Sequence, residues 1–101
     1  LLDELGKIAC KAAVIISSGL GHGEGSYFEQ ARLTARKYGL RIVGPNCIGV
    51  LCPPVRLNAS FAAHMPKAGD LALISQSGAI VSGIIEWATA RGIGFSSIVS
   101  V

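Results

Sequence analysis

The chain has 101 residues and a mass of 10.4 kDa; 50% of the residues are hydrophobic, 15% are charged, and the mean hydropathy is +0.54. This composition excludes a disordered protein, and the longest apolar runs, Ala12–Ile16 and Leu71–Ile74, are far shorter than the roughly 18 residues of a membrane span. A net charge of +3 without a dense basic cluster argues against nucleic-acid binding. We therefore expect a globular protein with no nucleic-acid partner and no membrane partner. The first residues lack the features of a signal peptide, so we expect a cytoplasmic location.

The chain has no initiator methionine and ends inside an apolar run, so we expect it to be a fragment of a longer polypeptide. The three cysteines lack the spacing of a disulfide framework or a zinc site, and neither His22 nor His64 has a second ligand at metal spacing. The few carboxylates form no acid–base pair. We predict no metal site and no catalytic residue in this chain.

The first third of the chain predicts a helix, a strand and a glycine loop. Residues 1–10 have apolar positions at the spacing of one helical face and are typical of the end of a helix. Residues 11–17 form a β-branched apolar run, which predicts a strand buried on both faces. This strand ends at a loop with glycines at positions 19, 21, 23 and 25.

A second helix and strand follow the glycine loop. Ser26 and Glu29 have the spacing of a capping box, in which the serine hydroxyl accepts from the Glu29 amide and the Glu29 side chain accepts from the Ser26 amide. The apolar spacing then predicts a helix up to Tyr38, with Gly39 as a left-handed C-cap. Residues 40–43 are a second strand. This βαβ order predicts a parallel strand pair.

The second half of the chain begins with a predicted connector. Residues 50–67 contain three prolines and have no clear period. From Gly69 onward a second βαβ pattern follows, with a strand at 71–74, a turn at 75–78, a helix at 79–90 and another strand at 95–101. The helix has apolar positions at 80, 81, 84, 85 and 88, and Gly92 can cap it. We therefore predict two α/β units, each incomplete.

Two loops are candidate binding sites, because ligands of open α/β sheets lie beyond the carboxyl ends of the strands. The glycine loop lacks the G-x-G-x-x-G register, with Glu24 where the third glycine should stand, so it is not a dinucleotide fingerprint. Its spacing alone leaves a flexible loop and a ligand loop equally open. The second loop, Ser75-Gln76-Ser77-Gly78, places two hydroxyls and free amides at a helix start that favours an anion. The alternative for Ser77, and the commoner use of such a serine, is a simple N-cap.

Three segments together carry a resemblance to a known family. They are Arg41-Ile42-Val43-Gly44-Pro45-Asn46-Cys47-Ile48-Gly49-Val50, then Leu57-Asn58-Ala59-Ser60-Phe61, then Leu73-Ile74-Ser75-Gln76-Ser77-Gly78-Ala79. In this order and separation they resemble the NDP-forming acyl-CoA synthetase superfamily. That superfamily includes ADP-forming acetyl-CoA synthetases, the succinyl-CoA synthetase α subunit and bacterial protein lysine acetyltransferases on the same scaffold.

The resemblance implies a Rossmann-like CoA-binding domain, of which residues 1–53 are the C-terminal part. It also implies a flavodoxin-like parallel-sheet domain, of which residues 70–101 are the N-terminal part. Residues 54–69 would be the linker. The family's CoA-contacting strand end matches Ile16, Ser17, Ser18 and Gly19. Its phosphate-binding helix start matches Ser75, Gln76, Ser77, Gly78 and Ala79.

The function implied is that of an ADP-forming acyl-CoA synthetase, which converts acyl-CoA, ADP and phosphate to acid, CoA and ATP through a phosphohistidine. That histidine would lie beyond Val101, so the fragment alone should be inactive. ATP or ADP and Mg²⁺ would be held by parts outside the chain, an ATP-grasp domain or subunit, and the protein would be an oligomer. Two alternatives stay open: the CoA-binding regulatory region of a protein lysine acetyltransferase, and a non-catalytic CoA-binding module. Ser18 and the inserted glycines depart from the succinyl-type pattern, which disfavours a succinate-specific enzyme.

Overall fold

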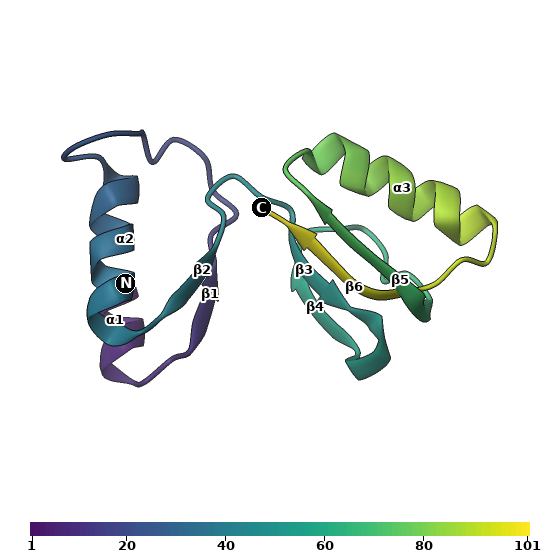
Figure 1. Cartoon of the computed structure of the whole chain (residues 1–101), viewed down its shortest axis with the longest axis horizontal. Coiled ribbons are helices and arrows are strands. Elements are labelled where there is room, and N and C mark those ends of the chain that lie inside the picture. The colour runs from purple at the N-terminus through teal and green to yellow at the C-terminus, as the bar shows by residue number, and fades with distance from the viewer. The chain divides into compact units, whose positions relative to one another are not determined.

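The structure, a computed structural model, describes all of residues 1–101 and divides the chain into two compact units, Leu1–Asn46 and Cys47–Val101 (Figure 1). The first unit contains, in chain order, α1 (Leu2–Lys7), β1 (Ala12–Val14), α2 (Tyr27–Tyr38) and β2 (Arg41–Val43). The second contains β3 (Gly49–Cys52), the 3₁₀ helix η1 (Pro53–Val55), β4 (Leu57–Ser60), β5 (Ala68–Ser75), α3 (Gly78–Ala90) and β6 (Phe95–Ser100). No helix has the length and apolar character that a membrane span requires.

The first unit confirms the predicted parallel pair. β1 pairs with β2 in parallel, with Ala13 opposite Ile42, and α2 lies along one side of this pair (Figure 1). The helix buries only its small residues Ala31 and Ala35, whereas Tyr27, which the apolar spacing included, is 73% exposed. Small residues allow the helix to pack close to the strands.

The caps of α2 are nearly those predicted. The Ser26 hydroxyl accepts a hydrogen bond from the Glu29 amide at 3.1 Å, and Gly39 is a left-handed C-cap with φ of 65°. The reciprocal bond of the capping box is different from the prediction: Glu29 Oε2 accepts from the Gly25 amide at 3.2 Å, while the Ser26 amide donates to the Gly23 carbonyl. Glu29 therefore ties the glycine loop to the first turn of the helix.

A charged cluster joins α1 to α2. Asp3 Oδ1 accepts from the Tyr38 hydroxyl at 2.7 Å and from Lys37 at 3.4 Å, while Asp3 Oδ2 lies 2.7 Å from Lys7 Nζ. The hydrogen bond from Lys7, followed by that from Tyr38, holds the pKa of Asp3 well below its usual range. A Cβ on Gly6 would overlap the Tyr38 ring, so the close contact of the two helices requires glycine there.

The second unit is a four-stranded mixed sheet in the order β4-β3-β6-β5. β5 and β6 are parallel, as the second βαβ pattern predicted, and both β3 pairings, with β4 and with β6, are antiparallel. The connector predicted for residues 50–67 is therefore wrong in part, because it contains most of β3 and all of η1 and β4. The sequence there has no alternating apolar pattern, because the short β4 is an edge strand and none of its four residues is fully buried.

The core of the second unit lies between α3 and one face of this sheet (Figure 1). Leu51 and Ile98 are opposite each other on β3 and β6, and Leu73 of β5 continues the row. The buried core residues are Ile48, Leu51, Val81, Ile85, Ala88, Phe95 and Ile98. Their burial supplies the main stabilising free energy of this unit.

The other face of the sheet is open in this chain. Val50, Val99 and Ile74 are opposite one another and one residue out of phase with the core row, so they lie on the opposite face. On this face Ile74 is 72% exposed. Apolar side chains elsewhere in the chain are exposed too, with Ile16 after β1 at 51% and Ile80 on α3 at 55%. The prediction of strands buried on both faces is thus wrong for this chain, because only one helix covers each strand pair.

Gly49 allows the tight β3–β4 pairing. Its φ is +120°, and a Cβ there would overlap the Ala59 carbonyl oxygen and lie 2.8 Å from the Ser60 Cα. Gly49→Ala should lower the free energy of unfolding by about 2 kcal/mol, from overpacking and backbone strain. As a control, Gly83→Ala in α3, where a Cβ meets nothing within 4 Å, should raise it by about 0.5–1 kcal/mol. Urea denaturation measures both changes, and equal effects of the two variants would contradict this role of Gly49.

The Asp3 cluster should make stability depend on pH. Because the pKa of Asp3 is lower in the folded chain than its unfolded value of about 3.9, its contribution is complete above that value and is lost as the pH falls further. Asp3→Asn should therefore lower the melting temperature at pH 7, and the difference from the parent should shrink below about pH 4. Glu4→Gln, which removes only an ion pair with the chain terminus, is the control. A difference for Asp3→Asn that stays constant from pH 7 to pH 3 would contradict this role.

Candidate functional site

The first candidate loop begins where β1 continues past its last paired residue. The Ile15 amide donates to the Val43 carbonyl at 2.9 Å, and the Asn46 amide donates to the Ser17 carbonyl at 3.0 Å. The chain after β1 is therefore held beside the chain after β2 as far as Ser17. This places the start of the glycine loop at the carboxyl edge of the parallel pair, where ligands of such sheets lie.

The glycine loop has a backbone that glycine allows and other residues rarely adopt. Gly19, Gly21, Gly23 and Gly25 all have positive φ, between 72° and 86°. The second half of the loop is tied to α2, because the Ser26 hydroxyl donates to the Gly23 carbonyl at 2.7 Å. The loop therefore follows a defined path into α2. Its positive φ angles account for the glycines, although these lack the spacing of a dinucleotide fingerprint.

The four predicted CoA-binding residues lie together on an exposed stretch of this edge. Ile16, Ser17, Ser18 and Gly19 are all exposed, and the hydroxyls of both serines make no hydrogen bond within the chain. A Cβ on Gly19 would meet nothing within 4 Å. The segment therefore offers free donors, free acceptors and an exposed apolar side chain to a ligand with a mixed surface.

The second candidate loop connects β5 to α3, and its serines are engaged in the turn. The Ser75 hydroxyl accepts from the Ser77 amide at 3.1 Å. Ser77 is the N-cap of α3, with its hydroxyl accepting from the Ile80 amide at 3.4 Å. The N-cap alternative for Ser77 is therefore confirmed, and the hydroxyl already has one backbone partner.

The first turn of α3 retains free amides. The amides of Gly78 and Ala79 make no hydrogen bond within the chain, and the turn contains no acidic residue. Unpaired amides and an uncompensated helix dipole favour an anion at this position. Gln76, also exposed, precedes the cap. The five residues predicted for phosphate binding therefore surround the start of α3.

Gly78 has a packing role that its neighbours in sequence did not indicate. A Cβ there would lie 3.2 Å from Ile48 Cγ1, so the glycine makes room for a buried core side chain. Ile48 is held in turn by its amide, which donates to the buried Ser100 hydroxyl at 3.1 Å. Ser100 is opposite Ser75 in the parallel pair. Ile48 and Ser100 position this loop. Ile48 lies in the Arg41–Val50 segment that carries the family resemblance, but its spacing did not indicate this role, and no motif marked Ser100.

The remaining nucleophilic and titratable candidates have structural surroundings. Burial raises the pKa of the Cys47 thiol, which keeps it protonated and unreactive at neutral pH. His22 packs edge-on against Phe28, with 6.1 Å between ring centroids. His64 is exposed, and no group of three or more potential metal ligands is present.

Two parallel strand pairs, each with a crossover helix and a loop at the carboxyl ends, define an α/β fold of the Rossmann and flavodoxin kind. Residues 68–101 match the family described as succinyl-CoA ligase like flavodoxin domain. The α subunit of acetate–CoA ligase [ADP-forming] I from Pyrococcus furiosus is 47% identical over 104 residues, covering 100% of this chain and 22% of the relative. The 4-hydroxybutyrate–CoA ligase [ADP-forming] of Nitrosopumilus maritimus is 43% identical over 106 residues, covering 100% of this chain and 15% of the relative.

A solved structure agrees with these relatives. The acetyl-coenzyme A synthetase 1 of Ca. Korarchaeum cryptofilum, in complex with phosphate and ADP, has a TM-score of 0.88 and 42% identity, covering 99% of this chain and 22% of its own. The chain therefore spans less than a quarter of the length of these relatives. It is homologous along its whole length to a segment of the ADP-forming acetyl-CoA synthetases, which confirms the resemblance to the NDP-forming acyl-CoA synthetase superfamily.

The cap of α3 can be tested directly. Ser77→Ala removes the hydroxyl that accepts from Ile80 and should lower the free energy of unfolding by about 1 kcal/mol. Ser82→Ala changes an exposed serine inside the same helix and should leave stability equal or up to about 0.5 kcal/mol higher. Chemical denaturation of the two variants separates the effects. If both variants unfold at the same denaturant concentration, Ser77 does not stabilise the helix start.

Proposed function

We propose that this chain is the part of an ADP-forming acyl-CoA synthetase that contributes one CoA-binding loop and one phosphate-binding loop. The observation that carries this proposal is homology over the whole chain to ligases of that kind, at 40–47% identity for the relatives from Methanocaldococcus jannaschii, Pyrococcus furiosus and Nitrosopumilus maritimus. The complete protein would interconvert acyl-CoA, ADP and phosphate with acid, CoA and ATP. By the family resemblance, a histidine outside residues 1–101 carries the phosphoryl group between acyl phosphate and ADP.

The two units would belong to two domains of that enzyme. Residues 1–53 are proposed as the C-terminal part of a Rossmann-like CoA-binding domain, and residues 70–101 as the start of the flavodoxin-like domain. The match of the flavodoxin family to residues 68–101 supports the second assignment. The break between units after Asn46 suggests that the residues predicted as a linker pack with the second domain.

The proposed ligand contacts follow the two loops. CoA would contact Ile16, Ser17, Ser18 and Gly19, whose exposed edge suits a ligand with both apolar and polar parts. Phosphate would bind at the start of α3, among Ser75, Gln76, Ser77, Gly78 and Ala79, where the amides of Gly78 and Ala79 are free. Phosphate at a helix N-terminus needs no positively charged side chain.

The other parts of the reaction require further polypeptide. ATP or ADP and Mg²⁺ would be held by an ATP-grasp domain or subunit, and the name of the α-subunit relative in P. furiosus supports assembly with a partner subunit. An oligomeric, cytoplasmic enzyme remains our prediction. The relatives act on different acids, acetate and 4-hydroxybutyrate by their names, so the acyl group is left unassigned.

Two other functions fit the same scaffold. A protein lysine acetyltransferase would use this region to bind acyl-CoA for regulation, and a CoA-binding module would have no activity. The synthetase is favoured because the similar proteins described above are ligases or synthetases by name.

The CoA loop is tested by titrating CoA into the intact protein by calorimetry. Ser18→Trp places a large side chain on the exposed segment and should weaken CoA binding by about tenfold or more, because it blocks the approach of the ligand. The control is Ser82→Trp, which adds the same side chain at an exposed position of α3 and should leave the affinity unchanged. Equal affinity of parent and Ser18→Trp would overturn the CoA assignment.

A further inference from the structure

A cavity of about 440 Å³ lies in the first unit between α2 and β2. Its volume is within the usual range of small-molecule sites. Its lining includes Phe28, Arg32, Arg36, Leu40, Ile42 and Gly44. None of these residues belongs to the proposed CoA or phosphate loops, so this cavity is a separate feature of the molecule.

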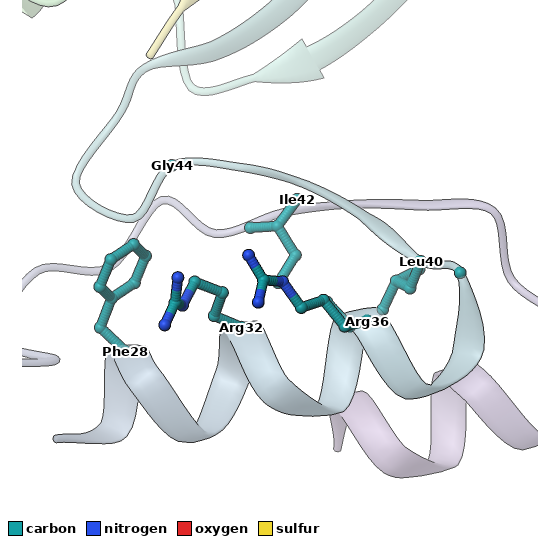
Figure 2. A pocket seen from close by; sticks show the side chains of 8 residues that line it. Phe28, Arg32, Arg36, Leu40, Ile42 and Gly44 are labelled. Atoms are coloured by element: carbon teal, nitrogen blue, oxygen red, sulfur yellow. The ribbon is translucent and has the colours of Figure 1, made fainter. Parts of the chain in front are cut away.

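Two arginines provide the charge of this cavity. Arg32 and Arg36 are four residues apart on α2, which places them on one face of the helix, one turn from each other. Figure 2 shows both guanidinium groups directed from α2 toward the space beneath β2, with Ile42 pointing toward them from the strand. Phe28 closes one end of the row and Leu40 the other.

Only one of these two charges has an acidic partner. Arg36 has no ion pair, and Arg32 has one long contact of 3.4 Å with Glu29, whose second oxygen already accepts from the Gly25 amide. The neighbouring Lys37 is engaged elsewhere, with Asp3 and over the Tyr38 ring. Two like charges at this spacing repel each other and destabilise the helix slightly. An anion between them would remove that repulsion.

The geometry favours a phosphate group over a carboxylate. A guanidinium presents a planar fork of donors, and one carboxylate satisfies one such fork. The three free oxygens and double charge of a phosphomonoester can accept from two arginines at once. The walls formed by Phe28, Leu40 and Ile42 offer an apolar and aromatic surface to the rest of the ligand.

We propose that this cavity binds a phosphomonoester with an apolar or aromatic body, with its phosphate held between Arg32 and Arg36. Nucleotides have this chemistry, and two sources can supply it: a free nucleotide, or the 3′-phosphate of a CoA molecule. The proposal depends on the cavity and its two arginines, and it does not rest on the proposed synthetase function.

Calorimetric titration of the intact protein with adenosine 5′-monophosphate tests the site, with adenosine as the uncharged comparison. Loss of a hydrogen-bonded charge is expected to change affinity by about tenfold or more. Adenosine should therefore bind at least about tenfold more weakly than the monophosphate, and Arg36→Gln and Arg32→Gln should each weaken the monophosphate by a similar factor. Both arginines are exposed, and a circular dichroism melt verifies that the variants fold.

Lys37→Gln is the matched control, because it removes the same charge from the adjacent position without touching the cavity. It should leave the affinity for the monophosphate unchanged. The proposal is overturned if Lys37→Gln weakens binding as much as Arg36→Gln or if adenosine binds as tightly as its monophosphate. It is also overturned if the monophosphate shows no saturable binding and Arg36→Gln leaves CoA binding unchanged.

The two sources are separated by comparing CoA with dephospho-CoA, which lacks the 3′-phosphate. If Arg36→Gln weakens CoA but not dephospho-CoA, the phosphate in the cavity belongs to CoA. If Arg36→Gln weakens the monophosphate and leaves CoA binding unchanged, the ligand is a separate nucleotide. Either result supports the site. No binding of the monophosphate, together with CoA binding that Arg36→Gln leaves unchanged, would overturn this site and leave the proposed CoA function intact.

Discussion

Parallel pairing of two strands around one helix is the constraint on which the other features of this chain depend. Parallel neighbours cannot be joined by a tight turn, so the chain must return over one face of the sheet, and here α2 and α3 make that return. The carboxyl ends of the paired strands then meet at one edge. This is why Ser17 lies beside Asn46 in the first unit, and why Ser75 lies opposite Ser100 in the second.

Close approach at the second loop is obtained with small residues and one buried hydroxyl. Gly78 leaves space for the Ile48 side chain, and the Ser100 hydroxyl accepts the Ile48 amide, which would otherwise be a buried donor without a partner. The helix start is thus held firmly while its first amides stay free. The proposed anion site and the core of this unit are consequently parts of one packing arrangement, and a change in Ile48 would be felt at both.

Electrostatic partners are unevenly distributed in the first unit. Asp3 interacts with Lys7, Lys37 and Tyr38 and joins the two helices, whereas Arg36 has no acidic partner. The lowered pKa of Asp3 reflects the first situation, in which an opposite charge favours the ionised form. Arg36, without an acidic partner, leaves positive charge beside the cavity. Local pairing, more than the small net charge, decides where this chain can attract an anion.

The sequence by itself determined the local structure and the family. The Ser26 cap, the left-handed Gly39, the parallel order of both βαβ units and the start of α3 could be predicted because each depends on residues close together in the chain. Only the tertiary structure decided the β3–β4 hairpin, the support of Ile48 by Ser100 and the cavity beside Arg36. Ile48 and Ser100 are far apart in the chain, so no local pattern joins them. The hairpin ends in a short edge strand without an alternating apolar pattern, and the cavity depends on how α2 packs against β2, so spacing reveals neither.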